Sequence, residues 1–229
     1  MWSGPRNLST AMMYSFAARG DFAVWDEPFY APYLSQTGLD HPMAGEILAH
    51  HEGDAKKVGA ACVGPIPDGA THFYMKHMPH HMMPDFPMDW AKACVNVHLI
   101  RHPARVIASY GSKRADPTLD DIGFAAQLRV FEKLGGVVID SSEIRKNPQK
   151  MLARLCAEID LGFTSDMLKW PAGGLAQDGV WARHWYESVH KSMGFAGPEG
   201  PLPELTGTQQ SLCDQVLPVY LHLKDCALR

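Results

Sequence analysis

Stretches rich in apolar and β-branched residues alternate along the chain with stretches whose apolar residues recur at helical spacing. The first kind predicts strands at Phe22–Glu27, His72–Lys76, Val95–Ile100 and Gly136–Ser141. The second kind predicts helices at Ser9–Arg19, Ala44–Glu52, Ile122–Leu134, Asn147–Ile159 and Gln209–Leu223. Runs such as FAVW and GGVVI are continuously apolar, which is typical of strands covered on both faces. Because segments of crossover length separate the strands, the pattern indicates right-handed βαβ units, a parallel sheet and an α/β fold.

The composition narrows the class of protein. With 229 residues, 46% of them hydrophobic, the chain is predicted to form one domain over residues 1–229. A net charge of −4 argues against nucleic acid or an anionic membrane as a partner. No run reaches the ~18 apolar residues of a membrane helix, and the first residues lack the apolar region of a signal peptide. The five cysteines are scattered without a CxxC pair, so we expect reduced thiols and a cytoplasmic location.

The segment SGPRNLST, at residues 3–10, combines a turn rich in small polar residues with the start of a predicted helix. Only Met1 and Trp2 precede it to supply a strand. A turn of this kind places several backbone N–H groups where an anion can bind. Arg6 adds a positive charge and a planar fork suited to phosphate or sulfate oxygens. The segment therefore predicts an anion site; the alternative is an ordinary strand-to-helix turn with a surface arginine.

A second candidate anion site lies in HLIRHPARVIASY, at residues 98–110. The apolar strand ends at Arg101, and Pro103 suits the first position of a following helix. Arg101 is thus expected at the carboxyl end of a strand, where open α/β sheets bind ligands. Ser109 borders the buried face of that helix, where a half-buried hydroxyl needs a partner. The alternative here is a helix cap with a salt-bridged arginine.

Together these segments resemble the sulfotransferase family. Its 5′-phosphosulfate loop, PKSGTT, is similar to Pro5–Thr10, with Arg6 at the lysine position and Leu8 at the glycine position. Its 3′-phosphate signature, an arginine, an x-Pro step and a serine eight residues after the arginine, matches RHPARVIAS at residues 101–109. YMKHMP at residues 74–79 resembles the KTHLP segment, and residues 141–163 resemble a later family segment. The family's late Gly-rich, basic nucleotide loop has no clear counterpart.

The resemblance implies a three-layer α/β/α fold with a central parallel sheet, the P-loop NTPase-like sulfotransferase fold. It also implies a sulfuryl donor, 3′-phosphoadenosine 5′-phosphosulfate (PAPS), whose desulfated form is 3′,5′-adenosine bisphosphate (PAP), and no required metal. The resemblance also implies a catalytic role for Arg6, which would stabilise charge on the leaving phosphate. The donor-binding residues that the resemblance implies are Arg6, Asn7, Leu8, Ser9, Thr10, Arg101 and Ser109.

The reaction also needs a base to take the proton of the acceptor, which we expect to be a small molecule with a hydroxyl or amine. The resemblance favours His77, whose unperturbed pKa of ~6.5 suits the role. Glu27 is the rival, as a carboxylate at a predicted strand end, and related sulfotransferases use a glutamate base. Two other classes stay open. One is a P-loop small-molecule kinase, which needs a loop lysine where Ser9 stands; the other is a non-catalytic nucleotide-binding protein of the same fold.

Overall fold

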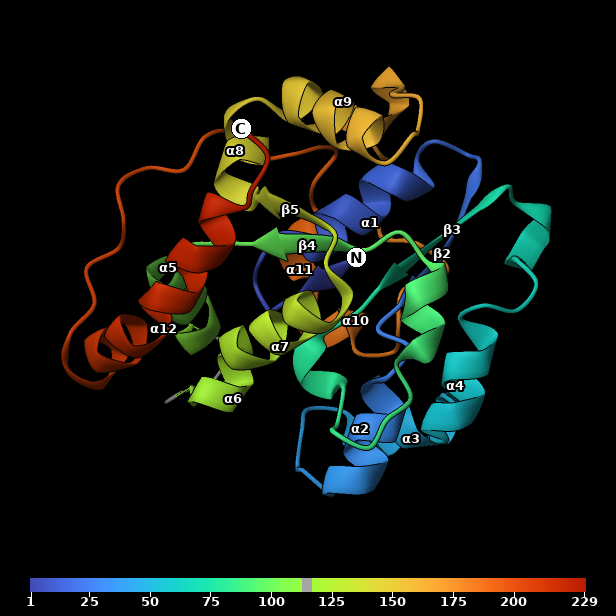
Figure 1. Ribbon diagram of the computed structural model, residues 1–229, viewed down its shortest axis with the longest axis horizontal. Coiled ribbons are helices and arrows are strands. Elements are labelled where there is room, and N and C mark those ends of the chain that lie inside the picture. Colours follow the sequence, from blue (N-terminus) through green and yellow to red (C-terminus); the bar gives the residue numbers. More distant parts are fainter. Residues whose placement is uncertain (113–116) are drawn as a thin grey trace. The chain divides into compact units, whose positions relative to one another are not determined.

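Parallel strands joined by helices make up the computed structural model, which describes residues 1–112 and 117–229 (Figure 1). The strands are β1 (Trp2–Ser3), β2 (Phe22–Asp26), β3 (His72–Lys76), β4 (Val97–Ile100) and β5 (Val137–Asp140). Within the described ranges they form two hydrogen-bonded sheets, in the orders β1-β4-β5 and β2-β3, and every pairing is parallel. The predicted α/β class with parallel strands is confirmed.

Helices fill most of the connections between the strands. The α-helices are α1 (Ser9–Ala17), α2 (Tyr30–Thr37), α3 (Ala44–His50), α4 (Ala55–Ala61), α5 (Pro103–Gly111), α6 (Leu119–Ile122), α7 (Phe124–Leu134), α8 (Ser141–Lys146), α9 (Pro148–Glu158), α10 (Ala182–Trp185), α11 (Glu187–His190) and α12 (Gly207–Asp225). Short 3-10 helices cover Pro67–Gly69, Pro79–His81, Asp89–Ala93 and Ser165–Leu168.

The chain divides into two compact units. Unit 1 comprises Met1–Ser9, Asn96–Phe163 and Ala196–Arg229, and unit 2 comprises Thr10–Val95 and Thr164–Phe195. Unit 1 contains the sheet β1-β4-β5, and unit 2 contains the pair β2-β3. The single-domain organisation of residues 1–229 stays a prediction.

Side-chain hydrogen bonds reinforce the short strand β1 in unit 1. Trp2 pairs with His98 of β4 in parallel register. The Trp2 indole donates to Asn96 Oδ1 at 2.8 Å, and Gln127 Nε2 of α7 donates to the Trp2 carbonyl oxygen at 3.3 Å. These bonds fix the point from which the loop at residues 4–8 begins.

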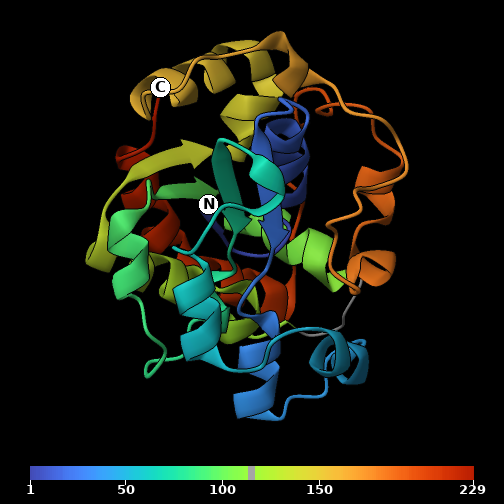
Figure 2. The same ribbon diagram turned by 90° about the vertical axis from the view of Figure 1, so that its right-hand side faces the viewer.

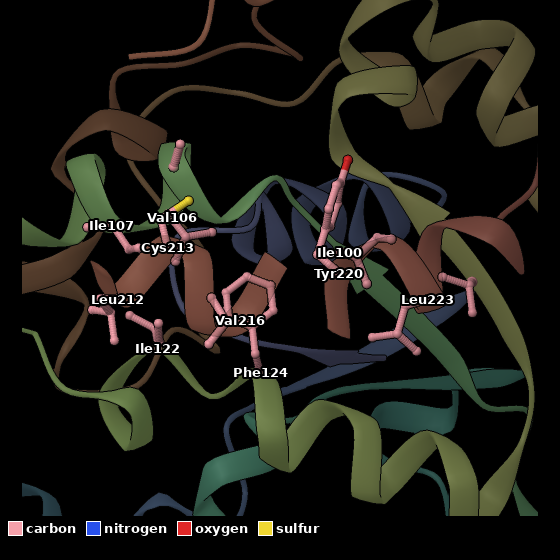
Figure 3. Close-up of a cluster of buried hydrophobic side chains, with 12 residues drawn as sticks. Ile100, Val106, Ile107, Ile122, Phe124, Leu212, Cys213, Val216, Tyr220 and Leu223 are labelled. Atoms are coloured by element: carbon pink, nitrogen blue, oxygen red, sulfur yellow. The ribbon is translucent and has the colours of Figure 1, made fainter. Parts of the chain in front are cut away.

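An apolar cluster packs α5, α7 and α12 against β4 and β5 in unit 1 (Figure 3). Its buried members are Ile100, Ala104, Val106, Ile107, Ile122, Phe124, Val138, Leu212, Cys213, Val216, Tyr220 and Leu223. Burial of this much apolar surface is the main stabilising contribution to such a layer. Because α12 packs against both α5 and β4, the core sets the position of Arg101 after the strand and of Ser109 on the helix.

The predicted helix at Ile122–Leu134 is wrong at its start. α6 ends at Ile122 and α7 begins at Phe124, because Gly123 between them has a left-handed backbone with φ 70°. A capping box between Thr118 and Asp121 begins α6, which the sequence did not predict. Helices α2 and α4 also lie in segments for which no element was expected.

In unit 2, β2 and β3 pair in register from Phe22 and His72 to Asp26 and Lys76. This register brings Asp26 and Lys76 side by side at the carboxyl ends of the two strands. Helices α2 and α3 lie against each other, as both views show (Figure 2), and bury a cluster that includes Trp181. Asp26 and Lys76, at the ends of β2 and β3, therefore belong to the same unit as this buried apolar cluster.

Candidate active site

The loop at residues 4–8, between β1 and α1 in unit 1, has an unusual backbone. Arg6 and Leu8 have positive φ values of 61° and 79°, which side chains other than glycine adopt at a cost of about 1–2 kcal/mol each. Asn7, between them, anchors the loop because its Nδ2 donates to the Leu99 carbonyl oxygen at 3.3 Å. Loops in which left-handed and other backbone conformations alternate in this way are found where successive N–H groups surround an anion. Ser9 then opens α1, whose first-turn N–H groups have no carbonyl partner within the helix.

The structure brings three of the predicted donor-binding side chains together within unit 1. Arg6 Nε donates to Ser109 Oγ on α5 at 3.0 Å. Arg101, directly after β4, donates from Nη1 to the Arg6 carbonyl oxygen at 2.6 Å. His102 caps α5, since its Nδ1 accepts from the Ala104 N–H at 3.2 Å. The two sequence motifs, about a hundred residues apart, therefore form one basic site.

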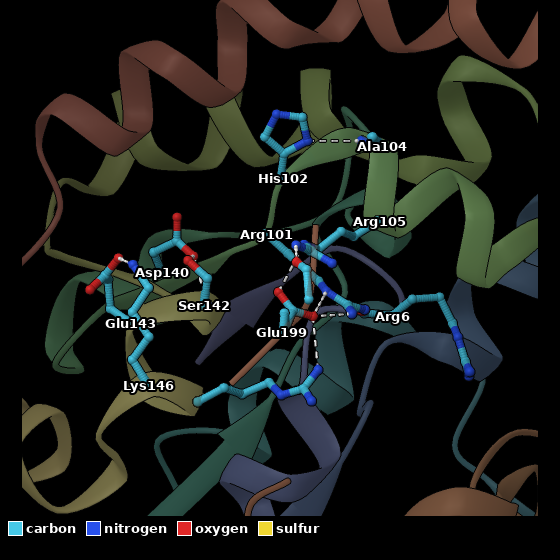
Figure 4. A network of polar contacts seen from close by, with 12 residues as sticks. Arg6, Arg101, His102, Ala104, Arg105, Asp140, Ser142, Glu143, Lys146 and Glu199 are labelled. Atoms are coloured by element: carbon cyan, nitrogen blue, oxygen red, sulfur yellow. Dashed lines mark hydrogen bonds and ion pairs between the residues drawn. The ribbon is translucent and has the colours of Figure 1, made fainter. Parts of the chain in front are cut away.

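Arg101 is also paired with a carboxylate, Glu199, which lies near the start of the last segment of unit 1, Ala196–Arg229 (Figure 4). Arg101 Nε donates to Glu199 Oε1 at 3.1 Å, and its Nη2 donates to the same oxygen. Arg145 Nη1 donates to that oxygen at 2.9 Å, and Arg105 Nε lies 3.1 Å from Oε2. Three guanidinium groups thus surround one carboxylate. For residues 98–110 the sequence left open a basic site or a salt-bridged arginine beside a helix cap. The structure has both features: Arg101 pairs with Glu199, and His102 caps α5.

Unit 2 holds a buried cluster of charged groups where β2 and β3 end. The fully buried Lys76 ammonium donates to Asp26 Oδ1 and to Glu27 Oε1, at 2.7 Å in each case. It also donates to the Tyr186 hydroxyl, which in turn donates to Asp26 Oδ2 at 2.8 Å. Burial alone lowers the pKa of Lys76, but the neighbouring Asp26 and Glu27 carboxylates raise it above its usual value. Lys76 therefore stays charged and holds the two acids in place.

Glu27, at the end of β2, combines a strained backbone with a shifted pKa. Its φ is 41°, a conformation that is rare for residues other than glycine. Burial raises the pKa of its carboxyl group, and the charge of Lys76 offsets this only in part. Oε1 accepts from Lys76, whereas Oε2 lies 3.9 Å from His81 Nδ1. That separation exceeds a hydrogen bond, so Oε2 is available to accept one.

His77 follows β3 and is buried among aromatic rings. Its imidazole lies 5.0 Å from the Trp90 ring and 5.9 Å from the Phe29 ring, measured between centroids. Burial lowers the pKa of His77 well below its usual value of 6.5. The side chain is therefore neutral at physiological pH and a weaker base than an ordinary histidine.

Sequence reasoning missed several residues of both clusters. Lys76 and Arg105 were within reach, because each lies in a motif that the sequence singled out: Lys76 directly before His77, and Arg105 one helical turn after Arg101. Arg145 lies in the segment at residues 141–163 that resembles the family, but nothing in the sequence linked it, Tyr186 or Glu199 to these clusters. They reach their clusters from distant parts of the chain, and only the folded structure shows those contacts.

Within residues 1–112 and 117–229, no three His, Cys, Asp or Glu side chains gather in an arrangement that could hold a metal ion. No helix of that same part has the length and apolar character needed to cross a membrane. The five cysteines are free thiols.

Comparison with known proteins agrees with the motifs. The model of the sulfotransferase domain family matches residues 1–227. The chain belongs to the sulfotransferase domain family. Two solved sulfotransferase domains resemble this family member in fold. The domain from the Synechococcus PCC 7002 olefin synthase has a TM-score of 0.55 at 18% identity, and the match covers 96% of this chain and 92% of that one.

The second solved structure is the sulfotransferase domain from the curacin biosynthetic pathway. It has a TM-score of 0.54 at 14% identity, with 95% of this chain and 94% of that chain covered. At these identities the likeness concerns the fold alone. The sulfotransferase fold predicted from the motifs is confirmed.

Curated relatives of this sulfotransferase-family chain come from Arabidopsis thaliana. Branched-chain-amino-acid aminotransferase-like protein 2 is 34% identical over 224 residues, which cover 96% of this chain and 40% of the relative. Branched-chain-amino-acid aminotransferase-like protein 1 is 34% identical over 230 residues, with 98% of this chain and 41% of the relative covered. The chain thus spans about two fifths of the length of these relatives.

Proposed function

We propose that this protein is a sulfotransferase that moves a sulfuryl group from PAPS to a hydroxyl or amine of a small-molecule acceptor. The observation that carries the proposal is the convergence of Arg6, Arg101 and Ser109, with 3.0 Å between Arg6 Nε and Ser109 Oγ. These side chains come from the two motifs that in the family bind opposite ends of the donor. Membership of the sulfotransferase domain family supports the reaction class. A cytoplasmic location stays a prediction.

The basic site of unit 1 fits a nucleotide with anionic groups at both ends. Arg6, Asn7 and the N–H groups of Leu8, Ser9 and Thr10 would hold the 5′-phosphosulfate. Arg101 and Ser109 would hold the 3′-phosphate.

Two kinds of contact contribute to the rate. When bound, the donor supplies the sulfuryl group and a phosphate leaving group on which negative charge develops. The Arg6 guanidinium stabilises that charge without reorganisation, because Ser109 and the loop backbone already orient it. Contacts at the distant 3′ end orient the donor and so contribute to catalysis through binding.

We infer that Glu27 is the base that takes the acceptor proton. Its pKa is raised by burial, which makes it a better proton acceptor at neutral pH than an ordinary carboxylate. Its Oε2 is available, and Lys76 fixes the position of its Oε1. His77 fits the role less well, since burial lowers its pKa well below 6.5. The resemblance favours His77, and the surroundings of the two side chains favour Glu27.

Titration calorimetry with PAP, and separately with ATP plus magnesium, tests the donor. The proposal predicts binding of PAP and weak or no binding of ATP. Tight ATP binding without PAP binding would establish the kinase alternative instead. That alternative already lacks the loop lysine, since Ser9 stands at its position.

Slow hydrolysis of PAPS in acceptor-free buffer tests whether the protein is an enzyme. We expect release of sulfate above the rate without protein, because the charge-stabilising groups act on water as well as on an acceptor. A protein that binds PAP but releases no sulfate is the non-catalytic alternative.

A further inference from the structure

A carboxylate of the protein itself sits in the anion site around Arg101. The Glu199 side chain is only 4% exposed, whereas those of Arg101, Arg105 and Arg145 are 18%, 17% and 22% exposed. Glu199 Oε1 accepts hydrogen bonds from Arg101 and Arg145. Oε2 is buried and accepts none within the described residues, although Arg105 Nε lies 3.1 Å from it. The cluster is therefore left with two unbalanced positive charges and one unsatisfied oxygen.

The residues on either side of Glu199 are tied to the same arginines. Arg145 Nε donates to the Gly197 carbonyl oxygen at 2.8 Å, and Arg105 Nη2 donates to the Gly200 carbonyl oxygen. We call Gly197–Gly200, with the sequence GPEG, the strap. It contributes no buried apolar side chain, so polar contacts to the arginines hold it in place. Contacts of this kind can be exchanged for those of another anion at little cost in packing.

We propose that the strap fills the 3′-phosphate subsite and that the 3′-phosphate of the donor displaces Glu199 from it. Arg105 and Arg145 then join Arg101 as phosphate ligands. A phosphate with a charge near −2 leaves one unbalanced positive charge among the three arginines, where Glu199 leaves two, and its three oxygens accept more hydrogen bonds than a carboxylate does. The displaced Glu199 regains water, which lowers its desolvation cost. This inference rests on the proposed function, because it takes the donor to carry a 3′-phosphate.

The displacement has a thermodynamic consequence. If the strap must leave before the 3′-phosphate binds, the apparent affinity equals the intrinsic affinity multiplied by the fraction of molecules in which the strap is open. Weakening the strap should therefore tighten binding of any ligand that carries a 3′-phosphate. A Glu199 that merely oriented the arginines would have the opposite effect, since its removal would loosen the site.

Titrations of Glu199→Gln with PAP and with adenosine 5′-monophosphate separate these cases. We expect PAP to bind at least ~10-fold more tightly than to the wild type, the effect of ~1.4 kcal/mol, while the affinity for the monophosphate, which lacks the 3′-phosphate, stays unchanged. Glu204→Gln removes the same charge from an exposed position of the same segment and should alter neither affinity.

Unchanged or weaker PAP binding by Glu199→Gln, with normal PAP binding by the wild type, overturns the strap proposal and leaves the donor assignment intact. Absence of PAP binding in both proteins overturns the donor assignment, and the strap proposal with it.

Hydrogen–deuterium exchange of the wild type tests the same point without any substitution. PAP should slow amide exchange in the loop at residues 6–10 and speed it at Glu199 and Gly200, because the strap leaves its site. Slower exchange at the strap in the presence of PAP would mean that Glu199 stays in place, which contradicts the proposal.

Discussion

Glu27 acquires its chemistry from the groups packed around it. Lys76 donates to its Oε1 at 2.7 Å, and the Tyr186 hydroxyl packs 3.2 Å from the same oxygen, so the carboxylate cannot rotate freely. Burial raises the pKa of the carboxyl group, and the adjacent Lys76 ammonium opposes part of that rise. A fixed carboxylate with a raised pKa is the arrangement expected of a general base.

Glu27→Gln should lower kcat at least ~100-fold, the lower range for loss of a general base. The affinity for PAP should stay within about twofold, because the amide keeps the shape of the side chain. His77→Ala should retain most of its turnover. Steady-state kinetics with PAPS and an acceptor found by screening measure both variants. Loss of turnover in His77→Ala alone would reverse the assignment, and activity in both variants would exclude both residues.

The pH profile of kcat/KM is a second test of whether Glu27 is the base. The proposed base, Glu27, can take a proton only when it is ionised, so activity should fall as the pH drops through its pKa. Because burial raises that pKa, the acid limb should lie above the usual value of 4.5 for glutamate. An acid limb at or below 4.5 would show that Glu27 does not control the proton transfer.

At the scale of elements, the turn before β5 depends on a glycine. Gly136 has φ 114°, and a Cβ at this position would come within 2.2 Å of the Asn96 carbonyl oxygen. That oxygen accepts the Val137 N–H at 3.0 Å, a bond that aligns β5 with β4. A side chain at residue 136 therefore opposes this register of the sheet in unit 1.

Gly136→Ala should therefore reduce the free energy of unfolding by about 2–4 kcal/mol, the range for strained backbone with overpacking. Gly38→Ala is the matched control, because Gly38 also has a positive φ (64°), in the ordinary left-handed region, but no atom lies within 4 Å of the added Cβ. It should cost only about 1 kcal/mol. Urea denaturation measures both variants, and equal losses would show that the contact with Asn96 is unimportant.

A buried histidine links β4 to α7 and to the same turn. His98 Nε2 donates to the Gly135 carbonyl oxygen at 2.9 Å, and its Nδ1 accepts from Gln127 Nε2 at 3.0 Å. Both bonds require the neutral ring with its proton on Nε2. Burial lowers the pKa of His98 from 6.5 to about 4.

His98 should make the fold sensitive to acid. The unfolded chain binds a proton to this histidine below pH 6.5, but the folded protein does so only near pH 4. The contribution of His98 to the free energy of unfolding is therefore complete above pH 6.5. It should decrease by about 3 kcal/mol as the pH falls to 4. The stability difference between the wild type and His98→Gln, measured in urea at pH 7.5 and 4.5, should shrink accordingly. A difference that does not change with pH would contradict the depressed pKa.

For the whole molecule, the features predicted from the sequence were mainly those with a local pattern, and most contacts between residues far apart in the chain were not predicted. The strand at His72–Lys76 was predicted with its observed ends, because an apolar run bounded by turn residues is a local signal. The break at Gly123 was missed, since an isolated glycine in a helical pattern is often tolerated. The R-x-P…S motif indicated Arg101 and Ser109, whereas Glu199 lies 98 residues from the arginine it contacts. Pairing at such a distance along the chain leaves no trace in a single sequence.

The central claim is that Arg6 and Arg101 bind the two anionic ends of one donor nucleotide. It is tested most directly by titrating PAP and adenosine 5′-monophosphate into Arg101→Ala, with the exposed Arg154 of α9, as Arg154→Ala, for control. Arg101→Ala should weaken PAP binding by about 2–3 kcal/mol, the scale of a lost charge-assisted contact, and leave the monophosphate unaffected. An unchanged dissociation constant for PAP would contradict the account, because the 3′-phosphate would then lie away from Arg101.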